Sequence, residues 1–313
     1  MAAQLQNPIF HDEAKAREWL EARVWKAGRV CPHCGAPEER SRKLEGKAHR
    51  SGLYQCNQCR EQFTTTVGTL FERSKIPLTK WLLAMFLLSA SKKGMSALQL
   101  SRMLGVSYKS TWFMMHRIRE AMNDSGASGP LGGPGKVIEA DETYMGGKET
   151  NKHKNKRNSR DMFGKKQAVL TLVERDGKAR SFHVPRVTAK TLRPIIVQTA
   201  HRASHLMTDG ARMYPAVGRE FAAHSAVDHA AGEYVRAGFH HSNTVENFFS
   251  ILKRGVYGVY HHVSEAHLAR YLVEFDFRYN TRDLTDMGRT IIAAEGIVGK
   301  RLTYRRTGHA AHA

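Results

Sequence analysis

Four cysteines near the start of the chain restrict its folding more than any other feature of the sequence. They form two Cys-x2-Cys pairs, Cys31–Cys34 and Cys56–Cys59, with 21 residues between the pairs. Each pair offers two thiolates from one tight turn, and two such turns can face each other and supply the tetrahedral sulfur set that zinc prefers. Because four sulfur ligands leave no open position for water, the spacing predicts one structural zinc ion in a small ribbon.

The charge balance indicates a polyanionic partner. The 313 residues include 49 Lys and Arg against 29 Asp and Glu, a formal net charge of +20, which favours nucleic acid over other partners. The longest apolar run, residues 81–90, is shorter than the roughly 20 residues of a membrane-spanning helix, so we expect a core helix there and no membrane partner. The first residues lack the pattern of a secretory signal, which predicts a cytoplasmic, nucleoid-associated protein. Reduced thiols in that compartment favour zinc over the alternative of disulfides.

Residues 76–122 are expected to form a helical DNA-binding unit. The segment from Ser96 follows the helix-turn-helix pattern, with Leu98 packed inside, Gly105 at the turn and a second helix from Ser107. Helix pairs with a Gly turn also occur in proteins that bind no DNA, but the charge and the neighbouring ribbon favour a DNA-binding role. The start of the second helix would then offer four side chains to base edges or phosphates: Tyr108, Lys109, Ser110 and Thr111.

The sequence pattern divides the chain into several parts. Gly, Ser and Pro dominate residues 123–136, which predicts a flexible linker. The order after the linker is strands, helix, two strands and helices, which indicates an α/β layer fold. The expected parts are an N-terminal helix with the four-cysteine zinc ribbon at 1–75, the helix-turn-helix unit at 76–122, the linker at 123–136, the α/β domain at 137–283 and a basic C-terminal tail at 284–313.

Three acidic residues in the α/β domain have surroundings unlike those of surface carboxylates. Asp141 and Asp209 each lie at an apolar strand, and Glu246 lies in a helical stretch with Lys253 two turns further on. Carboxylate oxygens suit Mg²⁺ or Mn²⁺, and two such ions about 3.5–4 Å apart can support phosphoryl transfer. Adjacent strand residues point to opposite faces, so Glu142 is not assigned to the same site as Asp141.

Each of these carboxylates also has an ordinary explanation. Asp209 stands before Gly210 and could simply form a turn, Glu246 alone fits a solvated helix face, and structural pairing would account for Asp141. Asn243, one turn before Glu246 on the same helix, is an alternative third ligand that supplies an oxygen without charge.

Several basic residues around these positions are candidates for DNA contact. Lys253, counted with the catalytic residues, and Arg254 beside it are expected to hold DNA phosphates. The Lys- and Arg-rich residues 146–160 fit either contact with the DNA backbone or a solvated loop. His240 and His241 precede the helix of Glu246 and could touch either the scissile phosphate or a surface carboxylate.

Together these segments resemble the DDE-type insertion-sequence transposases, in particular the bacterial group with a zinc ribbon and the pattern Asp, Asp, then Glu or Asn with a downstream Lys. The resemblance covers nearly the whole chain. It rests on the four cysteines and on the strings GTLFERSKIPLTKWLLAMFLLSASKKGMS, EADETYMGGKE, TDGARMYP and HHSNTVENFFSILKRGVYGVYHHVS. It implies a ribonuclease H-like catalytic domain with Asp141, Asp209 and Glu246 as the catalytic triad. Glu246 fits the 36-residue gap from Asp209 and the seven-residue step to Lys253, while Asn243 stays open.

The resemblance implies an enzyme that binds the terminal inverted repeats of an insertion sequence and catalyses DNA cleavage and strand transfer with two Mg²⁺ or Mn²⁺ ions. Two element ends must meet one target, so we expect a homodimer or larger assembly on double-stranded DNA. The alternatives are a DNA-binding regulator without catalysis and a nuclease without joining activity.

Overall fold

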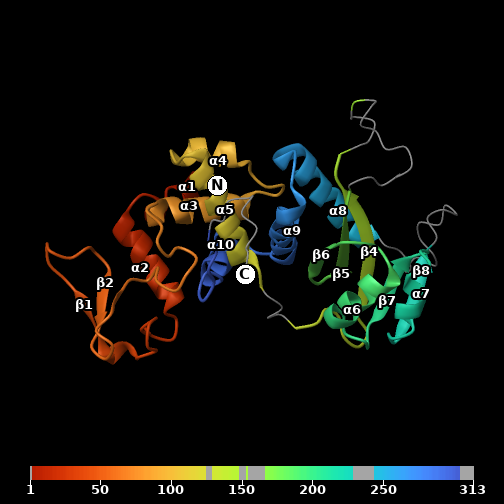
Figure 1. The fold of residues 1–313 in the computed structure, drawn as a ribbon, viewed down its shortest axis with the longest axis horizontal. Helices are drawn as coiled ribbons and strands as arrows, with labels where there is room; N and C mark the ends of the chain where they lie inside the picture. The colour runs from red at the N-terminus through yellow and green to blue at the C-terminus, as the bar shows by residue number, and fades with distance from the viewer. Residues whose placement is uncertain (1, 125–128, 148–152, 154–165, 228–242, 304–313) are drawn as a thin grey trace, which may run out of the picture. The chain divides into compact units, whose positions relative to one another are not determined.

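The computed structural model describes residues 2–124, 129–147, 153, 166–227 and 243–303. The chain forms two compact units (Figure 1). Unit 1 combines Met1–Asn123 with Asp283–Ala313, and unit 2 is Asp124–Arg282.

The first part of unit 1 is a small antiparallel sheet beside short helices. Its strands, in the order β1-β2-β3, are Ser41–Leu44, Leu53–Cys56 and Gln62–Phe63. The helices before β1 are α1 (Ala2–Leu5), η1 (Pro8–Phe10), α2 (Glu13–Val24) and η2 (Glu38–Arg40). Asp12 starts α2 by accepting hydrogen bonds from the backbone N–H groups of Ala14 and Lys15. Cys56 is the last residue of β2 and Cys59 lies in the turn between β2 and β3, whereas Cys31 and Cys34 precede η2.

The rest of unit 1 is helical: α3 (Leu78–Ala90), α4 (Ala97–Leu104), α5 (Tyr108–Met122) and α10 (Asp286–Glu295). The apolar run at 81–90 lies in α3 and most of its side chains are buried, which confirms the predicted core helix. Within the described residues, no helix combines the length and the apolar character that crossing a bilayer demands.

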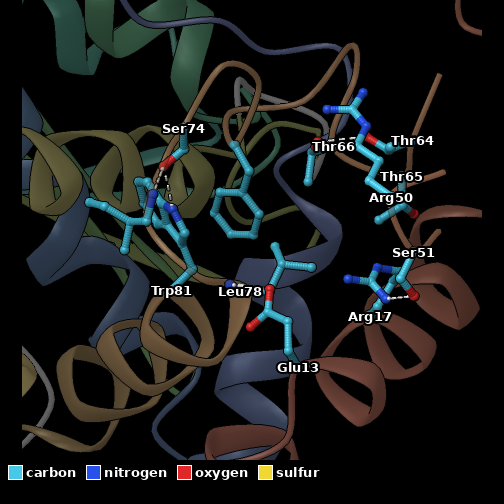
Figure 2. Close-up of a pocket in the computed structure, with 12 residues that line it drawn as sticks. Glu13, Arg17, Arg50, Ser51, Thr64, Thr65, Thr66, Ser74, Leu78 and Trp81 are labelled. Atoms are coloured by element: carbon cyan, nitrogen blue, oxygen red, sulfur yellow. Dashed lines mark hydrogen bonds between the residues drawn. The ribbon is translucent and has the colours of Figure 1, made fainter. Parts of the chain in front are cut away.

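A glutamate from α2 holds the start of α3. Pro77 precedes α3 and offers no side-chain hydrogen bond to it. The Glu13 carboxylate accepts the backbone N–H groups of Leu78 (2.9 Å) and Thr79 (3.2 Å) instead. Glu13 also lines a cavity of about 170 Å³ with Arg17 and Trp81 among its other walls (Figure 2). A carboxylate at a helix start is stabilising because the first N–H groups have no partner inside the helix.

The C-terminal segment, expected as a basic tail at 284–313, contributes a helix to unit 1. Helix α10 packs against α2, α3 and α5, and the chain after it pairs with residues 68–70 through Leu70 N–H to Ile297 O (3.1 Å) and Gly299 N–H to Gly68 O (3.0 Å). Ala293 and Ala294 of α10 are buried. The helices that α10 contacts end more than 160 residues before it in the sequence, so the local sequence does not predict this packing.

Unit 2 is a five-stranded mixed sheet with the order β6-β5-β4-β7-β8. Strands β4, β5 and β6 pair antiparallel, whereas β4, β7 and β8 run parallel. The strands are β4 (Val137–Met145), β5 (Gln167–Glu174), β6 (Ala179–Val184), β7 (His205–Asp209) and β8 (Ala223–Val227). The helices are α6 (Ala189–Thr199), α7 (Tyr214–Gly218), α8 (Asn243–Gly255) and α9 (Glu265–Asn280), with the π-helical turn η6 (Val256–Tyr260) after α8. The predicted α/β domain is thereby confirmed.

The two faces of this sheet carry separate cores. Ile138 and Ala140 of β4 pack in one cluster with residues of α6 and α7. Met145 of β4 and Val169 of β5 pack in the other with α8 and α9. Because strand side chains alternate between faces, the odd-numbered residues of β4 lie on the face that α8 and α9 cover.

Part of the predicted linker is built into unit 2. Leu131 is buried, and its backbone forms hydrogen bonds with Thr199 O (2.7 Å) and His201 N–H (2.8 Å). The Ser204 hydroxyl accepts the N–H of Gly133. The buried Leu131 side chain and these hydrogen bonds therefore attach residues 129–136 to unit 2. Residues 125–128 lie outside the described part of the chain.

Helix α9 closes the outer edge of β6. The Asn280 side chain pairs with the N–H (2.6 Å) and C=O (2.9 Å) of Ala179. The partly buried Asp276 carboxylate accepts the N–H (2.8 Å) and hydroxyl (2.6 Å) of Ser181. Side chains thus satisfy backbone groups that another strand would otherwise bind. Burial raises the pKa of Asp276 to about 7, although the Ser181 hydrogen bonds oppose the rise.

We predict that Gly296→Ala lowers the free energy of unfolding of unit 1 by about 2 kcal/mol, because an added Cβ would lie 2.1 Å from the backbone oxygen of Ala121. Urea unfolding followed by tryptophan fluorescence measures this, since all four tryptophans lie in unit 1. The matched control is Gly288→Ala in the same helix, where the nearest atom is 3.3 Å away in a side chain. Equal effects of the two changes would contradict the prediction.

We predict that Asp276→Asn flattens the pH dependence of stability of unit 2. A carboxyl whose pKa is raised by folding stabilises the protein below its unfolded pKa, and this contribution is lost as pH rises through about 7. The wild type should therefore lose stability between about pH 4 and pH 7 more steeply than the variant. Urea unfolding followed by circular dichroism across this range is the measurement, and parallel profiles would refute the assignment.

Candidate functional site

The four cysteine sulfur atoms lie close enough to share one ion. The Sγ atoms of Cys31 and Cys59 are 3.7 Å apart, as are those of Cys34 and Cys56, and all four lie within 4.8 Å of one another. Zinc–sulfur bonds of about 2.3 Å in a tetrahedron place sulfur atoms about 3.8 Å apart, whereas a disulfide needs about 2.05 Å. The cysteines are unbonded to one another, so the geometry fits zinc.

Backbone turns shape both cysteine pairs. Gly35 and Arg60 follow the knuckles in the left-handed region, with φ of 76° and 65°, and their N–H groups donate to the carbonyls of Cys31 (2.9 Å) and Cys56 (3.0 Å). The N–H groups of Cys59 and Gln58 lower the pKa of the Cys56 thiol to about 7. These hydrogen bonds favour the thiolate, which is the form that binds metal.

Helices α4 and α5 are joined by a glycine turn, as the sequence indicates. Gly105 ends α4 with φ of 59°, and the Ser107 hydroxyl accepts the N–H of Ser110 at the start of α5. Tyr108 is 55% exposed, and Lys109 and Ser110 are exposed beside it.

Two of the side-chain placements predicted for this helix pair are wrong. Thr111 is buried and its hydroxyl donates to Val106 O, so it is unavailable to DNA. Leu98, expected inside, is 55% exposed. The reason is helical phase: α4 buries Leu100 and Leu104, and a residue two positions from Leu100 lies on nearly the opposite side of the helix.

Asp141 and Asp209 lie on neighbouring parallel strands. Ala140 of β4 is in register with Thr208 of β7, and the two aspartates are the next residues along each strand. Both lie on the sheet face that α8 covers. Burial, together with the charges of Glu142, Asp209 and Glu246, raises the pKa of Asp141 to about 7, although the N–H of Glu142 opposes the rise. Divalent cations would relieve this accumulation of negative charge.

Helix α8 presents both candidates for the third ligand. Asn243, Glu246 and Lys253 are exposed, whereas the opposite face, with Val245, Phe248, Phe249 and Leu252, is buried against the sheet. The charge of Glu246 acts on Asp141, whereas Asn243 carries no charge, so this effect does not choose between the two candidates. Arg254 is exposed and donates to the Ser250 hydroxyl (2.7 Å).

The spacing of the acidic residues differs from that of the cysteines. In the part of the chain that the structure describes, the cysteines form the one group of three or more His, Cys, Asp or Glu residues whose ligand atoms all lie within 4.8 Å. Asp141, Asp209 and Glu246 therefore do not form a group of that compactness in the described residues. Two ions 3.5–4 Å apart with oxygen ligands at 2.0–2.1 Å span roughly 8 Å between outer ligands.

Glu142 and Asp209 make contacts that bear on the assignment. Glu142 accepts a short hydrogen bond from the buried Tyr214 hydroxyl of α7, on the sheet face opposite Asp141, and burial raises the pKa of Glu142. Asp209 accepts the N–H of Ala211 at 3.1 Å, so it does form the turn that its Asp-Gly sequence allows.

Glu139 is the residue that sequence reasoning missed. It is fully buried on the same face as Asp141 and contacts the first residues of α8 and Arg175. The signal was present in VIEADE, where an acidic residue stands inside an apolar strand two positions before Asp141.

Some expected contact residues fall outside the described part of the chain. These are His240, His241 and, within the basic segment 146–160, residues 148–152 and 154–160.

Comparison with known proteins gives matches over both units. Residues 11–62 match the transposase zinc-ribbon domain model, and residues 130–280 match the ISXO2-like transposase domain model. A protein of the transposable element ISH50 from Halobacterium salinarum, itself described as uncharacterized, is 29% identical over 281 residues, which cover 86% of this chain and 91% of that protein. A chain of the pre-cleavage Mos1 transpososome crystal structure matches at 11% identity over 68% of this chain and 78% of that chain, with a TM-score of 0.27, too low to infer a shared fold.

We predict that one zinc ion per chain is present and that its removal with a strong chelator unfolds the ribbon. Trp25 packs on Tyr54 and Phe63 beside the cysteines, so tryptophan emission should shift to longer wavelength as these rings separate. Cys56→Ser should reproduce the shift and reduce the zinc content. Full zinc content in that variant, measured by atomic emission, would contradict the four-cysteine site.

Proposed function

Since the chain belongs to the insertion-sequence transposases that carry a zinc ribbon and a DDE domain, we propose that it binds the terminal inverted repeats of its element and catalyses metal-dependent cleavage and strand transfer. The observation that carries this proposal is the placement of Asp141 and Asp209 on adjacent parallel strands, under the helix that bears Glu246. The mixed sheet with helices on both faces supports assigning unit 2 to the ribonuclease H-like fold.

The carboxylates of Asp141, Asp209 and Glu246 would hold two Mg²⁺ or Mn²⁺ ions, with Asn243 as the alternative third ligand. When bound, these ions activate the attacking oxygen and stabilise the leaving oxygen of a phosphodiester. Burial of Asp141 and the proximity of other carboxylates support this role, because buried like charges are costly without a cation. Lys253 and Arg254, exposed on α8, would hold the DNA phosphates and position the reacting end.

Unit 1 would supply the DNA recognition. Tyr108, Lys109 and Ser110 are exposed at the start of α5, where a recognition helix meets base edges. The net charge of +20 supplies non-specific attraction to the phosphate backbone. Joining two element ends to one target requires a dimer or larger assembly on the DNA, and the protein would act at the nucleoid in the cytoplasm.

The decisive experiment is a strand-transfer assay with Mg²⁺ and DNA that carries the ends of the element. Asp141→Asn and Asp209→Asn should each reduce the rate by about two orders of magnitude or more, while DNA binding is retained. The control is Glu220→Gln, a carboxylate of the same unit that pairs with Arg193 on the surface, which should leave the rate unchanged.

The products and the third ligand give further outcomes of the same assay. Glu246→Gln should inactivate and Asn243→Ala should not, and the reverse pattern would assign Asn243. Binding of the ends by the wild type without any cleavage would favour a regulator, and nicks without joined ends would favour a nuclease.

A further inference from the structure

We propose that Glu139 is a positioning residue that fixes where α8 places the third metal ligand relative to Asp141. This assignment rests on the proposed function, because it concerns the same acidic site. Glu139 itself is buried and directed at α8 and Arg175, so its role is to hold the elements that carry the ligands.

The carboxylate of Glu139 forms the N-terminal cap of α8. Its Oε2 atom accepts the backbone N–H groups of Thr244 (2.9 Å) and Val245 (3.0 Å), and its Oε1 atom accepts the Thr244 hydroxyl (2.9 Å). Helix caps are commonly Ser, Thr, Asp or Asn from the residue just before the helix. Here the acceptor lies 105 residues earlier in the chain, so the start of α8 is tied directly to β4.

Arg175, which directly follows β5, contacts both Glu139 and a residue of β7. Its Nε lies 2.6 Å from Glu139 Oε1, which compensates a charge that would otherwise be costly to bury. The same guanidinium reaches the sulfur of Met207 at 3.4 Å. Met207 stands two residues before Asp209, just as Glu139 stands two residues before Asp141.

The contacts of Glu139 therefore join the three elements that carry the acidic residues. Asp141 follows Glu139 by two positions on the same face of β4, and Glu246 follows the capped Val245 directly. Any shift of the first turn of α8 moves both Glu246 and Asn243. Metal sites need their ligands held to within a fraction of an ångström by surrounding hydrogen bonds, and this one cap supplies that restraint for whichever third ligand is used.

The test measures Mn²⁺ binding to the full chain and hydrogen exchange of the α8 amides in residues 243–249. Glu139→Ala removes all three of these hydrogen bonds to α8, so the dissociation constant for Mn²⁺ should rise at least tenfold and the amides should lose protection. Glu139→Gln keeps one oxygen for the backbone N–H groups, and Thr244→Val removes only the hydroxyl. Each should weaken Mn²⁺ binding roughly threefold, the effect of one hydrogen bond.

The matched control is Glu274→Gln. Glu274 is also fully buried in unit 2 and pairs with Arg278 and Tyr260, but it lies on α9, which carries none of the candidate metal ligands. This change should reduce thermal stability without altering the affinity for Mn²⁺ or the protection of α8. A merely structural role of Glu139 would make its variants behave like this control.

Three results would overturn the assignment. In the first, Glu139→Ala exposes the α8 amides but binds Mn²⁺ like the wild type. In the second, which decides the matter if Glu139→Ala does not fold, neither Glu139→Gln nor Thr244→Val changes the affinity. In the third, the wild type binds no Mn²⁺ at all, which removes the proposed metal site itself and the role of Glu139 with it.

Discussion

The capping of α8 by the Glu139 carboxylate is the interaction on which the candidate catalytic arrangement depends. Strands β4 and β7 fix Asp141 and Asp209 through backbone pairing, whereas α8 is joined to the sheet by apolar packing and by specific polar contacts. Glu139 supplies them at the first turn, one residue before Glu246. Unit 1 uses the same device, because Glu13 of α2 caps the start of α3. In both units a buried or half-buried glutamate from a distant segment accepts the first backbone N–H groups of a helix.

Unit 2 buries several acidic side chains although the chain as a whole is strongly basic. Glu139 and Glu274 are neutralised by arginines, and Asp276 accepts hydrogen bonds from Ser181. Asp141 instead lies among other carboxylates, and its pKa is raised by burial and by their charges. The buried acids with arginine partners hold the fold together, whereas the Asp141 group concentrates negative charge where divalent cations would bind.

The sequence predicted the features that depend on local spacing. The two cysteine pairs defined the ribbon because zinc geometry requires few residues in a fixed pattern. The apolar runs before Asp141 and Asp209 placed both on strands, and strand alternation separated Asp141 from Glu142. The placements that failed depend on distant partners. Leu98 and Thr111 were assigned without knowing which face of each helix the core covers, and α10 and Leu131 pack on segments far away in the chain. The role of Glu139 needed its partner 105 residues later.

The central claim is that Asp141, Asp209 and one residue of α8 hold two divalent cations. Anomalous diffraction from crystals of the protein grown with Mn²⁺ tests this most directly, since it locates the ions without relying on activity. The account predicts two peaks about 3.5–4 Å apart, with Asp141, Asp209 and either Glu246 or Asn243 as the residues that hold them. Crystals that show no manganese there at saturating Mn²⁺, or manganese bound only elsewhere, would contradict it.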